Sequence, residues 1–67
     1  MNGKKLKKQR EELGLTQREI SDYVGCSTRA ISLWESRNGD VNSYYLKKLS
    51  EILNISMEEL MDEEEDD

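Results

Sequence analysis

Three residue types are missing or nearly missing from this chain of 67 residues, which contains no histidine, no proline and a single cysteine, Cys26. One cysteine excludes an internal disulfide, and the lack of histidine excludes the usual Cys/His zinc sites. Without histidine there is also no Ser–His or Cys–His pair for nucleophilic catalysis. We therefore expect a protein that is not an enzyme, that holds no metal or cofactor, and whose stability comes from packed apolar faces.

Long apolar runs are missing too. No run of about 18 apolar residues is present, so the sequence predicts no membrane-spanning helix and no membrane partner. The basic residues near the N-terminus are not followed by the apolar stretch of a secretory signal. Together with the lone cysteine, these features favour a cytoplasmic location.

The charge is unevenly distributed along the chain. The formal net charge of -5 argues, at first sight, against binding to nucleic acid. However, residues 1–57 contain all 10 basic residues and seven acidic ones, a charge of +3, whereas residues 58–67 contain eight acidic residues, a charge of -8. We expect a mildly basic domain over residues 1–61 and an acidic, disordered tail over residues 62–67. The tail is interpreted as a solvated terminus; a sharper hypothesis is that it competes with DNA for the basic surface or contacts a protein partner.

Helical periodicity and helix-ending residues indicate five short helices. In residues 4–13, Leu6, Arg10 and Leu13 share one stripe, and Gly14 follows. Three further helices are expected to begin after the N-cap residues Thr16, Ser27 and Ser56, and another runs from about Ser43 to Leu53. Because no segment alternates with a period of two, we predict an all-α, compact five-helix domain.

The second and third of these helices are joined by only Gly25, Cys26 and Ser27. A connection this short predicts a helix-turn-helix. Trp34 lies on the inward side of the third helix and is expected in the core, whereas Tyr23 is expected at the edge of the core. Cys26 is interpreted as a small buried hydrophobe.

Four motifs then resemble a known family: Leu-Gly-Leu-Thr-Gln (13–17), Val-Gly-Cys-Ser (24–27), Ile-Ser-Leu-Trp-Glu (31–35) and Leu-Asn-Ile-Ser-Met-Glu-Glu-Leu (53–60). They resemble the lambda-repressor/Cro-like helix-turn-helix family, also called the Xre family, over residues 4–61. The resemblance implies a DNA-binding domain of a bacterial or phage regulator that binds a palindromic operator as a homodimer. The chain departs from the family at Leu33, a position more often polar, and in a less basic loop at 36–42.

The outward side of the third helix carries the candidate DNA-reading residues, Thr28, Arg29, Ser32 and Leu33. In a helix-turn-helix, the second helix of the pair enters the major groove with its N-terminal residues at base edges. Arg29 can donate two hydrogen bonds to guanine, and Leu33 can pack on a thymine methyl group. The alternative is an ordinary solvated helix face.

Four other residues are candidates for binding DNA phosphates: Gln17, Ser27, Arg37 and Asn38. Gln17 is the first residue of its helix, where free N–H groups and the helix dipole attract an anion. The resemblance implies the same role for this glutamine. Arg37 and Asn38 lie in a polar stretch that is otherwise interpreted as a flexible loop.

Arg10 lies on an apolar stripe, where an unpaired charge is costly. The resemblance implies that Arg10 pairs with Glu35 in a structural salt bridge that fixes the first helix against the third. The alternative is that Arg10 extends to water or to a phosphate.

Two functions follow from these observations. The first is a sequence-specific DNA-binding transcriptional regulator, acting as a repressor on double-stranded operator DNA. The second is a protein-interaction module, such as an antitoxin or adapter, which uses the same scaffold; the acidic tail and the weakly basic loop favour it.

Overall fold

The helices of this chain begin and end at residues suited to terminate a helix. In the computed structural model, which describes residues 1–37 and 41–62, the described residues form five α-helices and no strand. The helices are α1 (Gly3–Glu12), α2 (Gln17–Val24), α3 (Thr28–Arg37), α4 (Ser43–Leu53) and α5 (Met57–Met61). The predicted all-α, five-helix fold is therefore confirmed.

Side chains cap the helix N-termini as the sequence suggests. Thr16 and Glu19 form a reciprocal capping box at the start of α2, because each side chain binds the backbone N–H of the other residue. Ser56 caps α5 through the N–H of Glu59. Asn54 ends α4 in the left-handed conformation, with a φ of 59°.

The first helix differs from its predicted bounds of 4–13. The Asn2 side chain accepts hydrogen bonds from the N–H groups of Lys4 and Lys5, so α1 begins at Gly3. At the other end α1 stops at Glu12, and Leu13 follows as the C-cap. Leu13 is 46% exposed and does not share the buried stripe of Leu6, because the chain turns away there.

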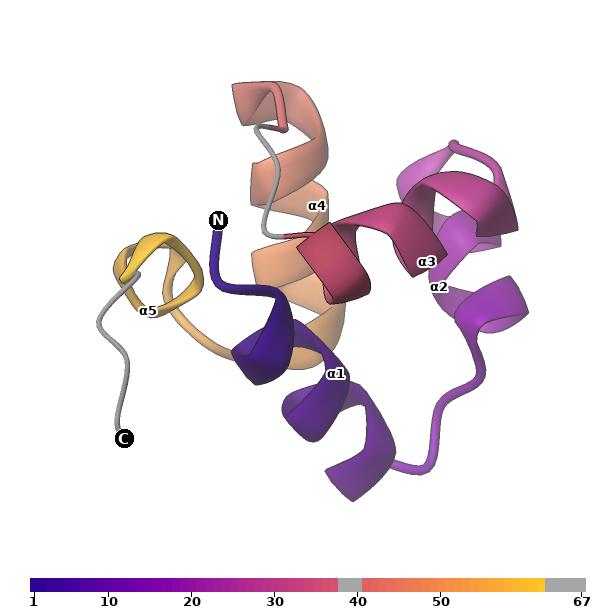
Figure 1. Cartoon of the computed structure of the whole chain (residues 1–67), viewed down its shortest axis with the longest axis horizontal. Coiled ribbons are helices and arrows are strands. Elements are labelled where there is room, and N and C mark those ends of the chain that lie inside the picture. The colour runs from indigo at the N-terminus through magenta and orange to yellow at the C-terminus, as the bar shows by residue number, and fades with distance from the viewer. Residues whose placement is uncertain (38–40, 63–67) are drawn as a thin grey trace.

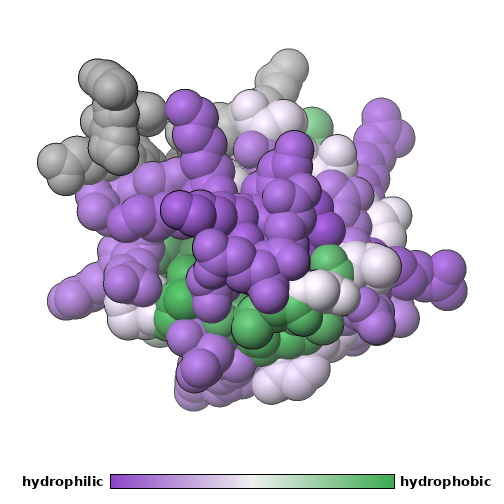
Figure 2. Space-filling view, turned by 90° about the horizontal axis from the view of Figure 1, so that it is seen from below, coloured by the Kyte–Doolittle hydropathy of each residue, from purple (hydrophilic) through white to green (hydrophobic). Residues whose placement is uncertain are grey.

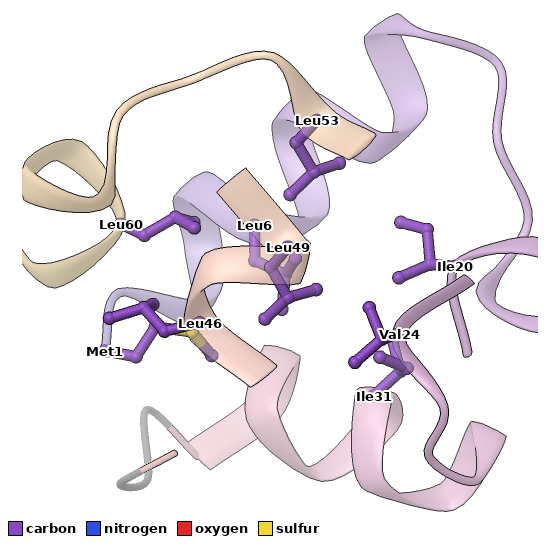
Figure 3. Close-up of a cluster of buried hydrophobic side chains, with 9 residues drawn as sticks. All are labelled: Met1, Leu6, Ile20, Val24, Ile31, Leu46, Leu49, Leu53 and Leu60. Carbon is purple, nitrogen blue, oxygen red and sulfur yellow. The ribbon is translucent and has the colours of Figure 1, made fainter. Parts of the chain in front are cut away.

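The helices surround one core (Figure 1). α3 packs against both α1 and α2, α4 packs against α2, and α5 contacts α1 and α4. α5 lies at the opposite side of the molecule from α2 and α3. Figure 3 shows the buried apolar side chains converging from all five helices and from the N-terminal residue: Met1, Leu6, Ile20, Val24, Ile31, Leu46, Leu49, Leu53 and Leu60.

The aromatic residues lie farther out than this core. Trp34 is partly buried, packs against the core and lies 5.7 Å from Tyr45, measured between ring centroids. Tyr23 is 46% exposed, more than the core-edge position that its place in the sequence suggests. Its hydroxyl donates to Glu51 of α4, so the ring bridges two helices at the surface instead of filling the interior.

The C-terminal end of the described chain is attached to α1. Asp62, at which the acidic tail was expected to begin, ends α5; its carboxylate lies 3.2 Å from Lys5 Nζ, and its carbonyl accepts from Asn2 Nδ2. Residues 63–67 lie outside the described residues.

The face seen from below is mostly hydrophilic, with a small apolar area near its centre (Figure 2). None of the helices in the described ranges has the length and apolarity that a membrane crossing needs.

Candidate nucleic-acid interface

α3 has one buried side and one exposed side. Ile31 is fully buried and Trp34 is partly buried, so this side of the helix is held against the core. The opposite side presents the four candidate base-reading residues, all of which are exposed: Thr28, Arg29, Ser32 and Leu33. Leu33 is 47% exposed, so its side chain is accessible from this side of the helix.

The turn before α3 sets the direction of the helix. Gly25 has a φ of 89°, in the left-handed region that glycine adopts without strain, and its N–H donates to the carbonyl of Ser21. Ser27 accepts a hydrogen bond from the N–H of Ala30 at 3.1 Å and so caps α3. Cys26, between them, is only partly buried and packs against the core, and burial raises the pKa of its thiol.

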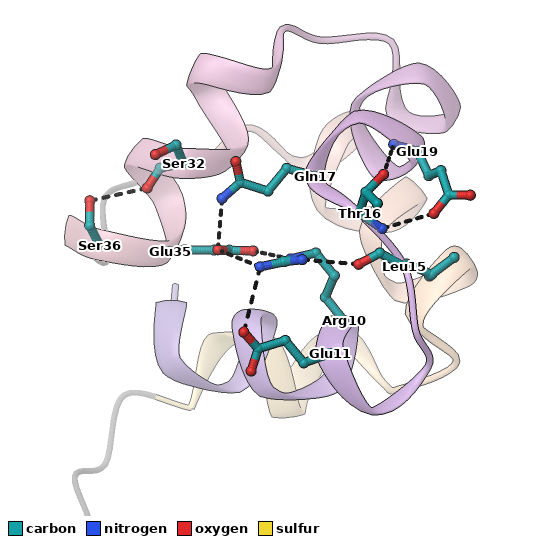
Figure 4. Close-up of polar contacts among 9 residues, drawn as sticks. All are labelled: Arg10, Glu11, Leu15, Thr16, Gln17, Glu19, Ser32, Glu35 and Ser36. Carbon is teal, nitrogen blue, oxygen red and sulfur yellow. Dashed lines mark hydrogen bonds and ion pairs between the residues drawn. The ribbon is translucent and has the colours of Figure 1, made fainter.

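A hydrogen-bonded network joins α1 to the two helices of the helix-turn-helix (Figure 4). Nε of Arg10 donates to Oε2 of Glu35 at 2.7 Å, and a second guanidinium nitrogen donates to Oε1 at 3.3 Å. The third donates to the carbonyl of Leu15, just before α2, at 2.9 Å. The structure therefore brings Arg10 and Glu35 together as the resemblance implies.

This pair is almost removed from water. The side chain of Arg10 is 12% exposed and that of Glu35 is 5% exposed. The hydrogen bond and the negative charge of Glu35 raise the pKa of Arg10, outweighing the opposing effect of burial. Because the pKa of Arg10 is higher in the folded than in the unfolded protein, loss of its proton does not limit stability at any pH below the unfolded value. Arg10 therefore stays charged throughout the physiological range.

Gln17 also joins this network. Its Nε2 donates to Oε1 of Glu35 at 3.0 Å, so the first side chain of α2 contacts the last part of α3 (Figure 4). Sequence reasoning missed this contact, because the two residues lie 18 positions apart on different helices and no helical period links them. It also missed Asn2 as a cap, although asparagine just before a helical stripe is an available signal.

Of the remaining candidate phosphate-binding side chains, the structure describes only that of Ser27. The Ser27 hydroxyl is used as a hydrogen-bond acceptor in capping, which leaves its hydrogen for another acceptor. The side chain of Arg37 and the whole of Asn38 lie outside the described residues. The arrangement thus presents hydrogen-bond donors at the starts of α2 and α3, beside the exposed side of α3 that carries Arg29. A major groove is wide enough to admit one α-helix.

Among known protein families, the model described as helix-turn-helix matches residues 6–60 of this chain. A search of curated proteins finds no match.

Solved structures that share the fold include the following three. The P22 c2 repressor in complex with a synthetic operator is 31% identical, with a TM-score of 0.85 over 92% of this chain and 94% of its own. The N-terminal DNA-binding domain of SinR from Bacillus subtilis is 26% identical, with a TM-score of 0.84 over 96% of this chain and 94% of its own. SinR in a complex with SinI is 31% identical, with a TM-score of 0.82; 94% of this chain covers 62% of that one.

Proposed function

Because this chain belongs to the helix-turn-helix family, we propose that it is a sequence-specific transcriptional regulator that represses by occupying operator DNA. The family and the solved relatives support a DNA-binding transcription regulator. The proposal adds the role of each residue and the arrangement on DNA: a homodimer on a palindrome, with α3 of each copy in successive major grooves about 34 Å apart.

One observation carries this proposal: α3 is fixed on its inward side and exposed on its outward side. Ile31 is 0% exposed, whereas Leu33, on the other side, is 47% exposed. A rigid helix with short polar side chains on its outer face can approach base edges closely, and Arg29 near its start can donate to guanine. Thr28, Ser32 and Leu33 are proposed to read the flanking positions.

The proposed phosphate contacts flank this helix. Gln17 begins α2 and Ser27 caps α3, and the backbone N–H groups of a first helical turn lack partners within the helix. Phosphate contacts fix the register of the protein on the duplex without reading sequence. Arg37 and Asn38 are proposed to complete the set on the far side of the groove.

Selection of bound duplexes from a random DNA pool tests the proposal. We expect an enriched sequence with twofold symmetry and half-sites about one helical turn apart. Enrichment of an asymmetric site would contradict the dimer, and no enrichment at any salt concentration would contradict the proposed function.

A substitution then tests the reading residue. Arg29→Ala should weaken binding to the enriched duplex by roughly 1–3 kcal/mol and relax the preference at one base pair. Lys8→Ala, an exposed lysine on α1, removes the same charge as a matched control and should leave base preference unchanged. Equal effects of the two variants on every base pair would contradict base reading by α3.

The proposed dimer surface lies at α5. Met57 and Met61 are 36% and 56% exposed, although Leu60 between them is fully buried. Exposed apolar side chains of this kind favour contact with a second copy. Met61→Glu should leave the unfolding midpoint nearly unchanged and reduce binding to the palindrome more than binding to a single half-site.

Protein interaction through the same scaffold is a second candidate function. Exposed Tyr44 and Tyr23 both lie against Lys48, whose Nζ is 5.9 Å and 5.4 Å from the two ring centroids. Tyrosine is enriched at energetically important positions of protein interfaces. If selection enriches no duplex, Tyr44→Ala should instead weaken capture of a protein partner by this face.

A further inference from the structure

The contact between Gln17 and Glu35 links a proposed phosphate-binding side chain to the buried ion pair. Nε2 of Gln17 lies 3.0 Å from Oε1 of Glu35, and the two oxygens of that carboxylate also accept hydrogen bonds from Arg10. The side chain of Glu35 is 5% exposed, and Gln17 as a residue is partly buried. The carboxylate is therefore held in place from α1 and contacts an amide that remains partly accessible.

We propose that Glu35 is a positioning residue for the contact of Gln17 with a DNA phosphate, an inference that rests on the proposed function. The nitrogen of a primary amide carries two hydrogens. Glu35 accepts one of them, which fixes the rotation of the amide and determines which end carries the nitrogen. The second hydrogen is then available for a phosphate oxygen at the start of α2.

The charge of the acceptor matters to this arrangement. A carboxylate accepts at both oxygens, so it can bind Arg10 and Gln17 at the same time. In Glu35→Gln, the single remaining oxygen binds Arg10, because hydrogen bonds from a cation are the stronger ones. The new NH₂ group then faces that of Gln17, and the Gln17 amide turns over to present its oxygen. The exchange keeps the size of the side chain, but it moves the donor of Gln17 away from the phosphate.

A double-mutant cycle on the enriched duplex tests this inference. Gln17→Ala and Glu35→Gln should each weaken binding by about five- to tenfold, the range expected for one hydrogen bond. In the Gln17→Ala background, Glu35→Gln should then change affinity by less than about twofold. Urea unfolding of all four proteins shows that affinity is measured on folded material.

Glu11→Gln provides the matched control. Glu11 also lies near Arg10, 4.0 Å from a guanidinium nitrogen, but it is 58% exposed, and its pairing with Arg10 does not involve Gln17. The variant removes the same charge from the neighbourhood of the same arginine. It should leave affinity within about twofold of wild type. Any general effect of losing one negative charge near DNA appears in both variants and is subtracted.

The side-chain amide signals of Gln17 give a second measurement that needs only the wild-type protein. In the free protein, one Nε2 proton should carry the shift of a proton bound to a carboxylate, and duplex addition should shift mainly the other proton. If Glu35→Gln does not fold, these two spectra still decide the question.

The possible results distinguish a failure of the proposed role of Glu35 from a failure of DNA binding itself. If the duplex binds but the effects of Gln17→Ala and Glu35→Gln multiply, Glu35 has only a structural role and the inference is wrong. The inference is also wrong if both Nε2 protons respond equally to DNA. If no duplex binds at all, the proposed function fails first.

Discussion

At the residue scale, a small set of fully buried side chains supplies most of the free energy of unfolding that a single substitution can remove. Leu6, Ile31 and Leu49 are 0% exposed, and they come from three different helices. Domains of this size rarely derive more than about 3–5 kcal/mol of net stability from a single core. One cavity can therefore remove most of the free energy of unfolding.

Leu49 on α4 gives the first prediction. Leu49→Ala should lower the free energy of unfolding by about 2–5 kcal/mol, because it removes packing contacts and leaves a cavity. Leu33→Ala is the matched control: the same substitution at a side chain that is 47% exposed should cost about 0.5 kcal/mol or less. Urea denaturation followed by circular dichroism measures both. Similar midpoints for the two variants would contradict the assignment of the core.

Cys26 gives the second prediction. Burial raises the pKa of its thiol above the usual value of 9.0, so the folded state binds the proton more tightly than the unfolded state. Its contribution to stability is complete below the unfolded pKa and is lost as pH rises through the folded pKa.

Two measurements check the direction of this pKa shift and of its effect on stability. Iodoacetamide should modify Cys26 more slowly than a free cysteine peptide at pH 7–8, since the thiolate is the nucleophile. Above about pH 9, the urea midpoint of wild type should fall relative to that of Cys26→Ala. Parallel pH curves for the two proteins would exclude the effect.

At the scale of the elements, the turn between α2 and α3 requires left-handed backbone at one residue. Gly25 adopts a φ of 89°, and a Cβ added to it would meet no atom within 4 Å. Substitution there is therefore limited by backbone conformation and not by space. This turn fixes the angle between the two helices that form the proposed DNA-binding surface.

A pair of substitutions at Gly25 isolates this requirement. Gly25→Ala should lower the free energy of unfolding by about 1–2 kcal/mol, the cost of left-handed backbone for an ordinary residue. Gly25→Asn should cost less, because asparagine tolerates this conformation. Equal costs in thermal unfolding would show that the turn has changed conformation.

At the scale of the whole molecule, the first residues hold the last helix in place. The N–H of Asn2 donates to the carbonyl of Leu60 at 2.7 Å, and its side-chain amide donates to the carbonyl of Asp62 at 2.7 Å. The same side chain caps α1 through its oxygen. Asn2 is only 7% exposed, so water replaces these bonds poorly.

Substitution of Asn2 separates capping from this link. Asn2→Ala loses the cap and the side-chain bond to Asp62 but keeps the backbone bond to Leu60, and it should lower the free energy of unfolding by about 2 kcal/mol. Asn2→Ser keeps a capping oxygen and should lose about half as much. Hydrogen exchange should localise the effect: in Asn2→Ser, amides of α5 should exchange faster than those of α1. Uniform acceleration would contradict a specific link to α5.

Most of the fold could be predicted from the sequence, because its signals are local. Capping residues such as Thr16 and Ser56, the glycine at 25 and the stripes of apolar residues act over four or five neighbouring positions. They place most helix ends within about one residue, and the error at Leu13 arose where a stripe continued past the end of its helix. The loop expected at 36–42 was also wrong at its start, because α3 continues through Ser36 to Arg37. The length of the turn likewise predicts the helix-turn-helix.

Only the tertiary structure decided which side chains meet across helices. Helical periodicity indicates on which side of its own helix each of Gln17 and Glu35 lies. It does not indicate that the two side chains touch at 3.0 Å. It predicts Tyr23 at the core edge, whereas the packing of α2 on α4 leaves the ring at the surface, bonded to Glu51. The physical reason is that the helical period determines only the direction in which a side chain points around its own helix axis. Contacts between helices depend on how the helix axes are packed together.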